Sequence, residues 1–261
     1  MEVAVLGSGS HGNATLVRSG DTTILLEAGF SARQIAARAR AAGFDPDAVE
    51  ALFISHGHSD HVQGAPVYSR RHKTVAFVPD SAHEAVCRAR RGRAVRYHHR
   101  ESLVPGETVQ VGCLRVRTFP VPHDAEGTMG FVVEAEGMRF GYVTDLGHVT
   151  TLVIERLRGC DALLIEMNHD PDLLREGPYP WDLKQRIASR HGHLSNEQGA
   201  ALLESALGSD TRVILLGHLS ETNNLPVIAL TSARLAVERA GRGDVRVLPA
   251  EPHRPSPAVR L

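Results

Sequence analysis

Ser55-His56-Gly57-His58-Ser59-Asp60-His61 places three imidazoles and one carboxylate directly after the apolar run of residues 51–54. An apolar run of that size followed by a polar segment with glycine predicts a buried strand that opens into a loop. His56 and His58 are two positions apart, so both side chains can point the same way from an extended chain. Asp60 and His61 follow where a helix is expected to begin, and they can face a second point in space.

This histidine-rich stretch has the chemistry of a metal site. Neutral imidazole and carboxylate are the usual ligands of zinc, manganese and iron, and open sites built from them activate water for hydrolysis. The alternative is a polar loop that happens to be rich in histidine. Ligands at this density favour the metal site, so we predict that residues 56–61 bind divalent metal.

The composition is that of an ordinary globular protein. The chain has 261 residues, of which 42% are hydrophobic and 23% charged, and this length can bury a sizeable core. The formal net charge of −1 gives no overall attraction to nucleic acid. Any binding of a polyanion must therefore come from a local basic patch.

Cysteine usage and hydropathy point to a cytoplasmic protein. Cys87, Cys113 and Cys160 are widely spaced without a Cys-x-x-Cys pair, which argues against a disulfide framework or a thiolate zinc site. The apolar start at residues 3–6 is too short for the core of a signal peptide, and no apolar run approaches the length of a membrane span. We expect one domain over residues 1–250, followed by a tail over 251–261 that contains three prolines and packs loosely.

Strand and helix signals alternate along the chain. Hairpins are expected at residues 14–26 and 131–140, and Ser31 is expected to cap a helix that reaches residue 42. The patterns Ser81-x-x-Glu84 and Ser195-x-x-Gln198 predict capping boxes at the start of two further helices. Buried strands are expected at 140–144, 162–165 and 213–216, with helices at 150–158 and 227–240. Residues 167–192 are predicted to be irregular and to act as a lid.

The most basic part of the chain lies in the segment from residue 88 to residue 100. This basic segment could follow a phosphate backbone, or it could be a solvated helix face. Its members are Arg88, Arg90, Arg91, Arg93, Arg96, His98, His99 and Arg100. Arg70, Arg71 and Lys73 could contribute to the same phosphate-binding surface.

The pattern His-x-His-x-Asp-His after a strand resembles the signature of the metallo-β-lactamase superfamily. Glu27, His123, Asp145 and His218 follow the family's order along the chain. Within the superfamily, residues 7–13, 166–170, 177–181, 192–196 and 218–224 are most similar to the YycJ/WalJ group of cytoplasmic, exonuclease-like proteins. The resemblance implies an α+β fold, the αβ/βα four-layer sandwich in which two mixed sheets pack face to face with helices outside.

The resemblance also implies a site for two divalent metal ions, Zn or Mn, with Fe possible. In the family's pattern one ion is bound by His56, His58 and His123 and the other by Asp60, His61 and His218, while Asp145 bridges both. Asp60 is thereby expected to take part in catalysis. Glu27 stands in place of a more usual Asp and is expected to orient the metal loop by accepting a hydrogen bond. His11 is a second departure from the pattern, at a position where a small residue is expected.

Further residues are expected to handle the substrate. The arrangement of Glu166, His193 and His218 is similar to that in transfer-RNA-processing zinc nucleases, where a Glu-oriented histidine protonates the leaving oxygen. We therefore expect His193 and Glu166 to be catalytic, against the alternative that His193 merely precedes a capped helix. Asn168, His169 and Asn223 are expected to contact substrate.

The leading functional hypothesis is a metal-dependent phosphodiesterase that acts on nucleic acid, and the resemblance to the YycJ/WalJ group implies a 5′-end DNA exonuclease. The alternative within hydrolases is a small-molecule (cyclic) phosphodiesterase, or a lactone or thioester hydrolase, with the same two metals. A redox di-iron protein of this fold is disfavoured, because that branch replaces the histidine at position 58 with a carboxylate. A regulatory module without activity is disfavoured because no expected ligand is missing.

Overall fold

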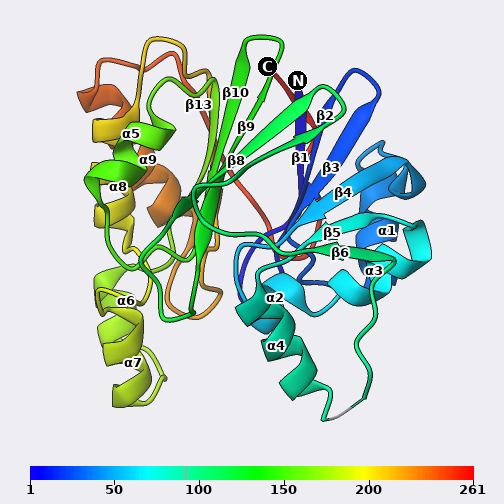
Figure 1. Ribbon diagram of the computed structural model, residues 1–261. Helices are drawn as coiled ribbons and strands as arrows, with labels where there is room; N and C mark the ends of the chain where they lie inside the picture. Colours follow the sequence, from blue (N-terminus) through cyan, green and yellow to red (C-terminus); the bar gives the residue numbers. More distant parts are fainter. Residues whose placement is uncertain (92) are drawn as a thin grey trace. The chain divides into compact units, whose positions relative to one another are not determined.

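The structure is a computed structural model that describes residues 1–91 and 93–261 (Figure 1). The chain forms two compact units. Unit 1 comprises Met1–Thr118, Ala125–Met129 and Glu251–Leu261, and unit 2 comprises Phe119–Asp124 and Gly130–Ala250. No helix within these described residues has the length and apolar character needed to cross a lipid bilayer.

The first sheet belongs to unit 1 and has seven strands in the order β14-β1-β2-β3-β4-β5-β6. The strands are β1 (Glu2–Gly7), β2 (Ala14–Ser19), β3 (Thr22–Leu26), β4 (Val49–Phe53), β5 (Val75–Phe77), β6 (His99–Glu101) and β14 (Val259–Arg260). The pairs from β14 to β3 are antiparallel, and those from β3 to β6 are parallel. Strands β3 and β4 are buried almost throughout, as expected for central parallel strands.

The second sheet repeats this plan with the order β13-β12-β11-β10-β9-β8-β7. Its strands are β7 (Thr108–Val111), β8 (Leu114–Pro120), β9 (Met129–Ala135), β10 (Met138–Val143), β11 (Ala162–Glu166), β12 (Val213–Gly217) and β13 (Arg246–Pro249). The β7–β8 and β9–β10 pairs are antiparallel, whereas β10 to β13 are parallel. The predicted fold class, two mixed sheets combined with helices, is confirmed.

Helices in each unit pack on one another and on their sheet (Figure 1). Unit 1 contains α1 (Ala32–Ala41), the short 3₁₀ helix at Pro46–Ala48, α2 (Ser59–Val62), α3 (Ala65–His72) and α4 (Asp80–Ala89). Unit 2 contains α5 (Thr151–Leu157), α6 (Pro171–Glu176), α7 (Trp181–Ile187), α8 (Asn196–Ala206) and α9 (Pro226–Arg239). In unit 2, α8 packs against α5 and α9, and α9 packs against β13.

Two of the three predicted helix starts have the expected chemistry. Ser31 and Ser195 each form a complete capping box, in which the side chain of a glutamine three residues later returns to the backbone of the capping serine. The third prediction is wrong in detail. Helix α4 begins at Asp80 after Pro79 without a side-chain cap, and the Ser81 hydroxyl instead donates to the Glu126 carbonyl at 2.9 Å.

Residues 167–192 are not irregular as predicted, because they contain α6 and α7. Helix α6 starts with a proline and is capped by Asp170, whose carboxylate accepts from the backbone of Asp172 and Leu173 at 3.0 Å. Both helices are short, and α7 has no buried residue. Helices this short and exposed have too few periodic apolar positions to be predicted from the sequence.

The C-terminal residues are packed, contrary to the loose tail expected over 251–261. Ser256 exchanges hydrogen bonds with the backbone of Val5, at 2.8 Å through its amide and 3.0 Å through its hydroxyl. The Arg38 guanidinium donates to the Pro252 carbonyl at 2.9 Å. Strand β14 then pairs with the edge of β1, so the backbone of this segment satisfies its hydrogen bonds within the first sheet.

Each unit has its own apolar core. In unit 1 the core joins strand residues such as Leu16, Leu25 and Leu52 to Ile35 of α1 and Tyr68 of α3, all fully buried. In unit 2 a second core joins β10–β13 to α5, α8 and α9. The parallel strands of both units end in polar residues, and in open sheets of parallel strands these carboxyl ends are where ligand sites form.

Candidate metal centre

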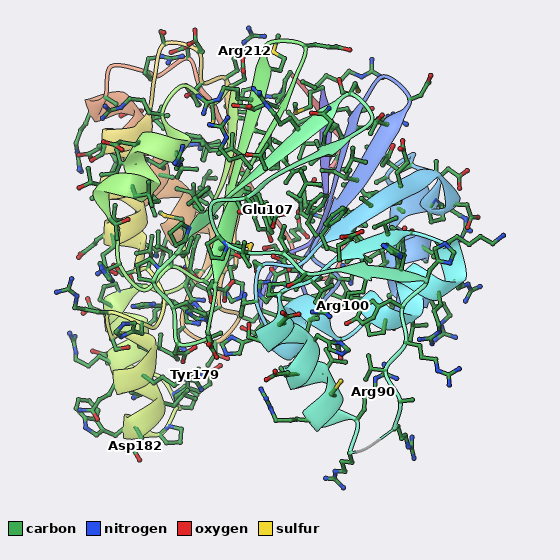
Figure 2. All side chains as sticks on the ribbon, in the orientation of Figure 1. Arg90, Arg100, Glu107, Tyr179, Asp182 and Arg212 are labelled. Atoms are coloured by element: carbon green, nitrogen blue, oxygen red, sulfur yellow. The ribbon has the colours of Figure 1, made fainter. Side chains whose placement is uncertain are left out.

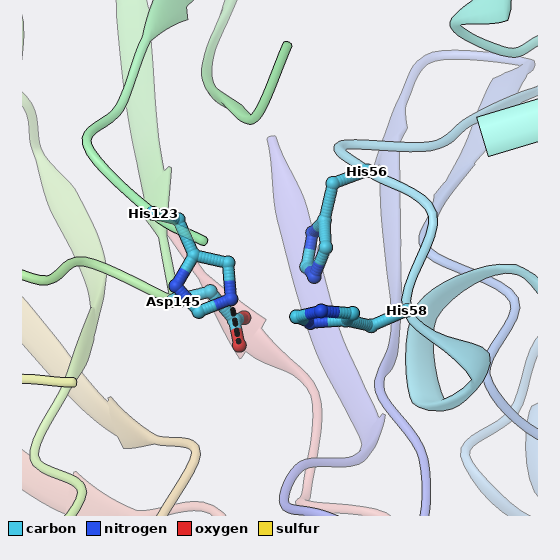
Figure 3. Close-up of side chains that lie close together, drawn as sticks. All are labelled: His56, His58, His123 and Asp145. Atoms are coloured by element: carbon cyan, nitrogen blue, oxygen red, sulfur yellow. Dashed lines mark ion pairs between the residues drawn. The ribbon is translucent and has the colours of Figure 1, made fainter. Parts of the chain in front are cut away.

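In unit 1 the predicted metal motif occupies the loop after β4 and the start of α2. The His56 and His61 side chains are fully buried, and their ring centroids are 4.3 Å apart. The His56 and His58 rings lie edge to face with centroids 4.7 Å apart, and Figure 3 shows both rings projecting from the loop. His56 and His58 therefore project together, as their spacing predicted, and the ring of His61 also lies beside that of His56.

Ser55 and Glu27 contact the Nδ1 atoms of two of these imidazoles. The Ser55 hydroxyl lies 2.8 Å from Nδ1 of His56. The fully buried Glu27 carboxylate accepts from the Ser55 backbone N–H at 3.2 Å, and its other oxygen lies 3.5 Å from Nδ1 of His61. The Ser55 hydroxyl at Nδ1 fixes the orientation of the His56 ring and directs its Nε2 away from Ser55, toward a ligand. These are the contacts that an orienting role for Glu27 requires.

Asn13 is part of this site, although the sequence did not single it out. Its backbone N–H donates to the Asp60 carbonyl at 2.8 Å, and its side-chain nitrogen lies 3.0 Å from Nε2 of His61. Its side-chain oxygen accepts from the Gly9 backbone and the Ser8 hydroxyl at 3.0 and 2.9 Å. The turn at residues 7–13 is therefore tied to the metal loop. Glycine and serine make up most of residues 7–12 and favour a turn, but this composition does not show which side chain faces the histidines.

Replacing Glu27 by Ala should destabilise unit 1, because the buried Ser55 N–H would lose its acceptor. A buried donor left without a partner costs about 1–3 kcal/mol. We expect the unfolding free energy of metal-free protein, measured by urea denaturation, to fall by about that amount. Glu50→Ala, an exposed glutamate on β4, is the matched control and should change it little. An unchanged unfolding free energy for Glu27→Ala would contradict the orienting role.

In unit 2, Asp145 is surrounded by imidazoles. Its side chain is almost fully buried, and its Oδ1 lies 3.4 Å from Nε2 of His218. The same oxygen lies 3.8 Å from Nε2 of His123, the ion pair marked in Figure 3, and 3.8 Å from Nδ1 of His193. The structure thus gathers three predicted histidines around this one carboxylate, which follows β10. They are His123 after β8, His193 before α8 and His218 after β12.

His123 is held in the tautomer that a metal ligand needs. Its Nδ1 lies 3.0 Å from the Gly192 carbonyl, to which it donates a hydrogen bond. With Nδ1 used by this carbonyl, Nε2 is the ring atom that faces Asp145 and that a metal could bind. Asp124, which the sequence did not single out, lies 3.3 Å from the same Nε2 and also pairs with Arg186.

Glu166 connects the predicted catalytic histidine to the rest of unit 2. Its fully buried carboxylate accepts from the backbone of Leu146 at 2.9 Å and of Leu194 at 3.1 Å. The remaining oxygen lies 2.7 Å from Nδ1 of His193 and 3.5 Å from Nδ1 of His218. Two backbone donors fix the carboxylate, so Glu166 in turn fixes the ring of His193.

His193 stands next to a candidate metal ligand. Its ring stacks on that of His218 with centroids 5.2 Å apart and an interplanar angle of 13°. Burial lowers the pKa of His193, but the neighbouring carboxylates of Glu166 and Asp145 outweigh burial and raise the pKa above the usual value. The second ring nitrogen, Nε2, is turned away from Glu166 and is the atom that can deliver a proton.

The three residues expected to contact substrate have different surroundings. The Asn168 amide donates to the His218 carbonyl at 2.9 Å and lies 3.1 Å from Nδ1 of His218, so it holds that ring in place. Asn223 is buried, and neither side-chain amide atom has a hydrogen-bond partner among the described residues. His169 is also buried and borders a pocket between α6 and α7. Contact with substrate stays a prediction for all three.

Three candidate site residues have a left-handed backbone. Glu27, Asp145 and His218 have φ values of 64°, 57° and 54°, and each follows the end of a buried strand. For residues other than glycine this conformation is uncommon and is concentrated at functional sites. The conformation turns each side chain sharply away from its strand. Sequence patterns carry no signal for it at positions where glycine is absent.

The donor chemistry of both units fits divalent metal. Unit 1 contributes imidazoles and Asp60, and in unit 2 the ligand atoms of Asp145, Glu166, His193 and His218 all lie within 4.8 Å of one another. Nitrogen and carboxylate donors without thiolate suit zinc, manganese or iron.

Comparison with known proteins agrees with the fold and this chemistry. A family described as "Beta-lactamase superfamily domain" matches residues 22–218. The chain is 32% identical over 261 residues to exodeoxyribonuclease WalJ of Streptococcus pneumoniae, covering 99% of this chain and 97% of that protein. It is 30% identical over 252 residues to exodeoxyribonuclease YycJ of Bacillus anthracis, covering 93% and 91%.

A solved structure shows the same fold. Zn²⁺-bound PqqB from Methylobacterium extorquens superposes with a TM-score of 0.72 and 24% identity, with both chains fully covered. The family match and the two relatives together establish that this chain belongs to the metallo-β-lactamase superfamily of hydrolases, in the group that contains WalJ and YycJ.

Proposed function

We propose that the chain is a metal-dependent phosphodiesterase that degrades DNA from a 5′ end. The observation that carries this proposal is the pair formed by His193 and Glu166, at 2.7 Å, beside His218 and Asp145. Cleavage of a phosphodiester expels a sugar oxygen, which needs a proton, and a buried carboxylate that orients an imidazole is suited to supply one. The names of the relatives, exodeoxyribonuclease in both cases, support DNA as the substrate.

The ligand roles in this proposal follow the family resemblance. His56, His58 and His123 would hold one ion, Asp60, His61 and His218 the other, and Asp145 would contact both. When bound, such ions activate water and stabilise the negative charge that develops on the phosphoryl group. Glu27, Ser55 and Asn168 keep the imidazoles oriented. We propose zinc or manganese as the ion, and the cytoplasm as the location of the enzyme and its DNA.

The basic segment supports a polyanionic substrate. Arg88, Arg91, Arg93 and Arg96 are exposed. Arg100 is different, because it pairs with Asp80 and donates to the Val78 carbonyl at 3.2 Å, which gives it a structural role. Exposed guanidinium groups that bind phosphates release counterions, so binding of DNA through this segment should weaken steeply as salt increases.

A metal-reconstitution assay tests the proposal. Protein stripped of metal and then given Mn²⁺ or Zn²⁺ should release mononucleotides from 5′-phosphorylated DNA, and protein in excess EDTA should release none. Substrates labelled at one end or the other distinguish release from the 5′ end from release at the 3′ end. Release from the 3′ end would correct the polarity. If no metal supports DNA cleavage while a small phosphodiester is hydrolysed, the small-molecule alternative replaces the nuclease.

A further inference from the structure

A pocket of about 330 Å³ lies between α6 and α7 in unit 2. Pro171, Leu174 and Arg175 line it from the α6 side, and Trp181 and Lys184 from the α7 side. Its volume is in the lower part of the range of small-ligand sites, roughly 300–1,000 Å³. The two helices are drawn in yellow-green in Figure 1, and in Figure 2 Asp182 marks the start of α7.

Trp181 gives this pocket an exposed aromatic wall. Its side chain is 66% exposed, the largest exposed fraction among the large hydrophobic residues described. An exposed indole presents a wide flat surface that is poorly hydrated, and such surfaces on nucleic-acid-binding proteins stack against bases. Trp181 is also the only tryptophan in the sequence, so it is a natural reporter for the pocket.

His169 gives the pocket a buried polar group that lacks a protein partner. The residue is 4% exposed, lines the pocket, and its Nδ1 has no hydrogen-bond partner among the described residues. Burial lowers the pKa of His169 to about 4, so the ring is neutral at pH 7. A neutral imidazole offers one donor and one acceptor, which matches the mixed edge of a nucleobase. A buried nitrogen without a partner favours a ligand that supplies one.

The charge of the lining suits a phosphodiester chain. Arg175 and Lys184 are both in the lining, which contains no carboxylate. The Lys184 ammonium donates to the Arg175 backbone carbonyl at 2.7 Å, which ties the Lys184 side chain to α6. Arg175 also pairs with Asp172 at 2.8 Å and Glu176 at 3.4 Å, but exposed pairs of this kind are weak and can exchange for phosphate.

The pocket is joined to the catalytic pair within the same unit. The His193 backbone donates to the carbonyl of Ile187, the last residue of α7, at 2.9 Å. His169 forms a bridge with Ser195, and its carbonyl accepts from the Asn196 backbone at 2.8 Å. Two parts of the pocket wall, α7 and His169, are therefore hydrogen-bonded to the segment that carries His193.

We propose that this pocket binds one unstacked nucleobase of a single-stranded DNA substrate, with Trp181 stacking on the base and His169 at its edge. Arg175 and Lys184 bind the adjoining phosphates. The inference rests on the proposed nuclease function and adds a preference for single strands, because a base within a duplex is already stacked.

The fluorescence of Trp181 tests this directly. Full-length Asp145→Asn protein, which should bind without cleaving, is titrated with oligothymidylate, with an abasic oligomer of equal length, and with a blunt duplex. We expect saturable quenching by oligothymidylate alone. Equal quenching by the abasic oligomer, or no quenching by any of them, would overturn the base pocket.

Substitution gives an independent measurement. In the wild-type background, Trp181→Ala should raise KM for single-stranded DNA about 5- to 100-fold with kcat little changed, since one stacking contact is lost from ground state and transition state alike. Trp181→Phe should retain most of the affinity, and Val227→Ala, which removes another exposed apolar side chain in unit 2, should have no effect.

The two proposals fail in different ways. If Trp181→Ala degrades single-stranded DNA with unchanged KM, the base pocket is wrong and the nuclease stands. If the wild-type protein degrades no DNA with any metal, the nuclease is wrong. Quenching by oligothymidylate would in that case still identify a base-binding pocket.

Discussion

Replacing Asp145 by Asn should lower metal-supported activity by about 10³–10⁴-fold while the protein remains folded. Asp145 has its Oδ1 within 3.8 Å of three imidazoles, and in the proposed site its carboxylate would hold both ions. The neutral amide has the same shape but no charge to hold the ions together. We expect the transition state to lose about 5 kcal/mol of the charge stabilisation that bound metal provides. Because each 1.36 kcal/mol changes the rate tenfold, this loss corresponds to a rate lower by about 10³–10⁴-fold.

Asn is preferred to Ala here because of the backbone. Asp145 has a φ of 57°, a left-handed conformation that Asn tolerates far better than Ala. Metal content after dialysis should fall from the wild-type value, while circular dichroism and the unfolding transition of the metal-free protein should stay close to wild type. Asp210→Asn, an exposed aspartate of the same unit, should retain metal and activity. Full metal content and full activity in Asp145→Asn would show that Asp145 is not a ligand.

The sequence predicted the parts of the fold whose signals are local. Continuous apolar runs predicted the buried strands β11 and β12, and Ser31 and Ser195 with their glutamines predicted the starts of α1 and α8. The spacing of His56 and His58 also predicted that their side chains would lie together.

The parts that failed depend on contacts between distant segments. The last residues looked loose because three prolines suggest a tail, yet the edge of β1 offers unpaired backbone groups that only a second strand can satisfy. Ser81 was predicted to cap a helix, but its hydroxyl donates to the backbone carbonyl of Glu126, which is 45 residues away. Asn13 went unassigned because its role depends on contacts with Asp60 and His61, which lie 47 and 48 residues away along the chain.

In both units, functional residues directly follow the ends of buried strands. In each unit a buried strand ends, and the functional residue comes directly after it with a left-handed backbone that turns its side chain out of the sheet. Examples are Glu27 after β3 and His218 after β12. The cores hold the strand ends rigidly, so the strained backbone is sustained by packing and not by local propensity. Single residues such as Glu27 were therefore weak signals in the sequence, although packing fixes their positions in the structure.

His193→Ala should slow cleavage of DNA by about 10²–10⁴-fold, the usual contribution of a general acid. The loss should depend on the leaving group. A DNA linkage expels a basic sugar oxygen that needs the proton, whereas bis(p-nitrophenyl) phosphate expels a phenolate that is stable without one. We therefore expect His193→Ala to hydrolyse the nitrophenyl ester at close to the wild-type rate with the same metal content.

Glu166→Gln should show the same dependence through its effect on His193. The amide still accepts from the Leu146 and Leu194 backbone through its oxygen, so the fold should hold. Its nitrogen then faces Nδ1 of His193, 2.7 Å away in the wild type, and favours the tautomer in which Nδ1 accepts. The ring is left neutral, with a proton on Nε2 that it releases poorly. If both substrates slow equally in both variants, His193 and Glu166 act by holding His218 and the metal, and the proton must come from elsewhere.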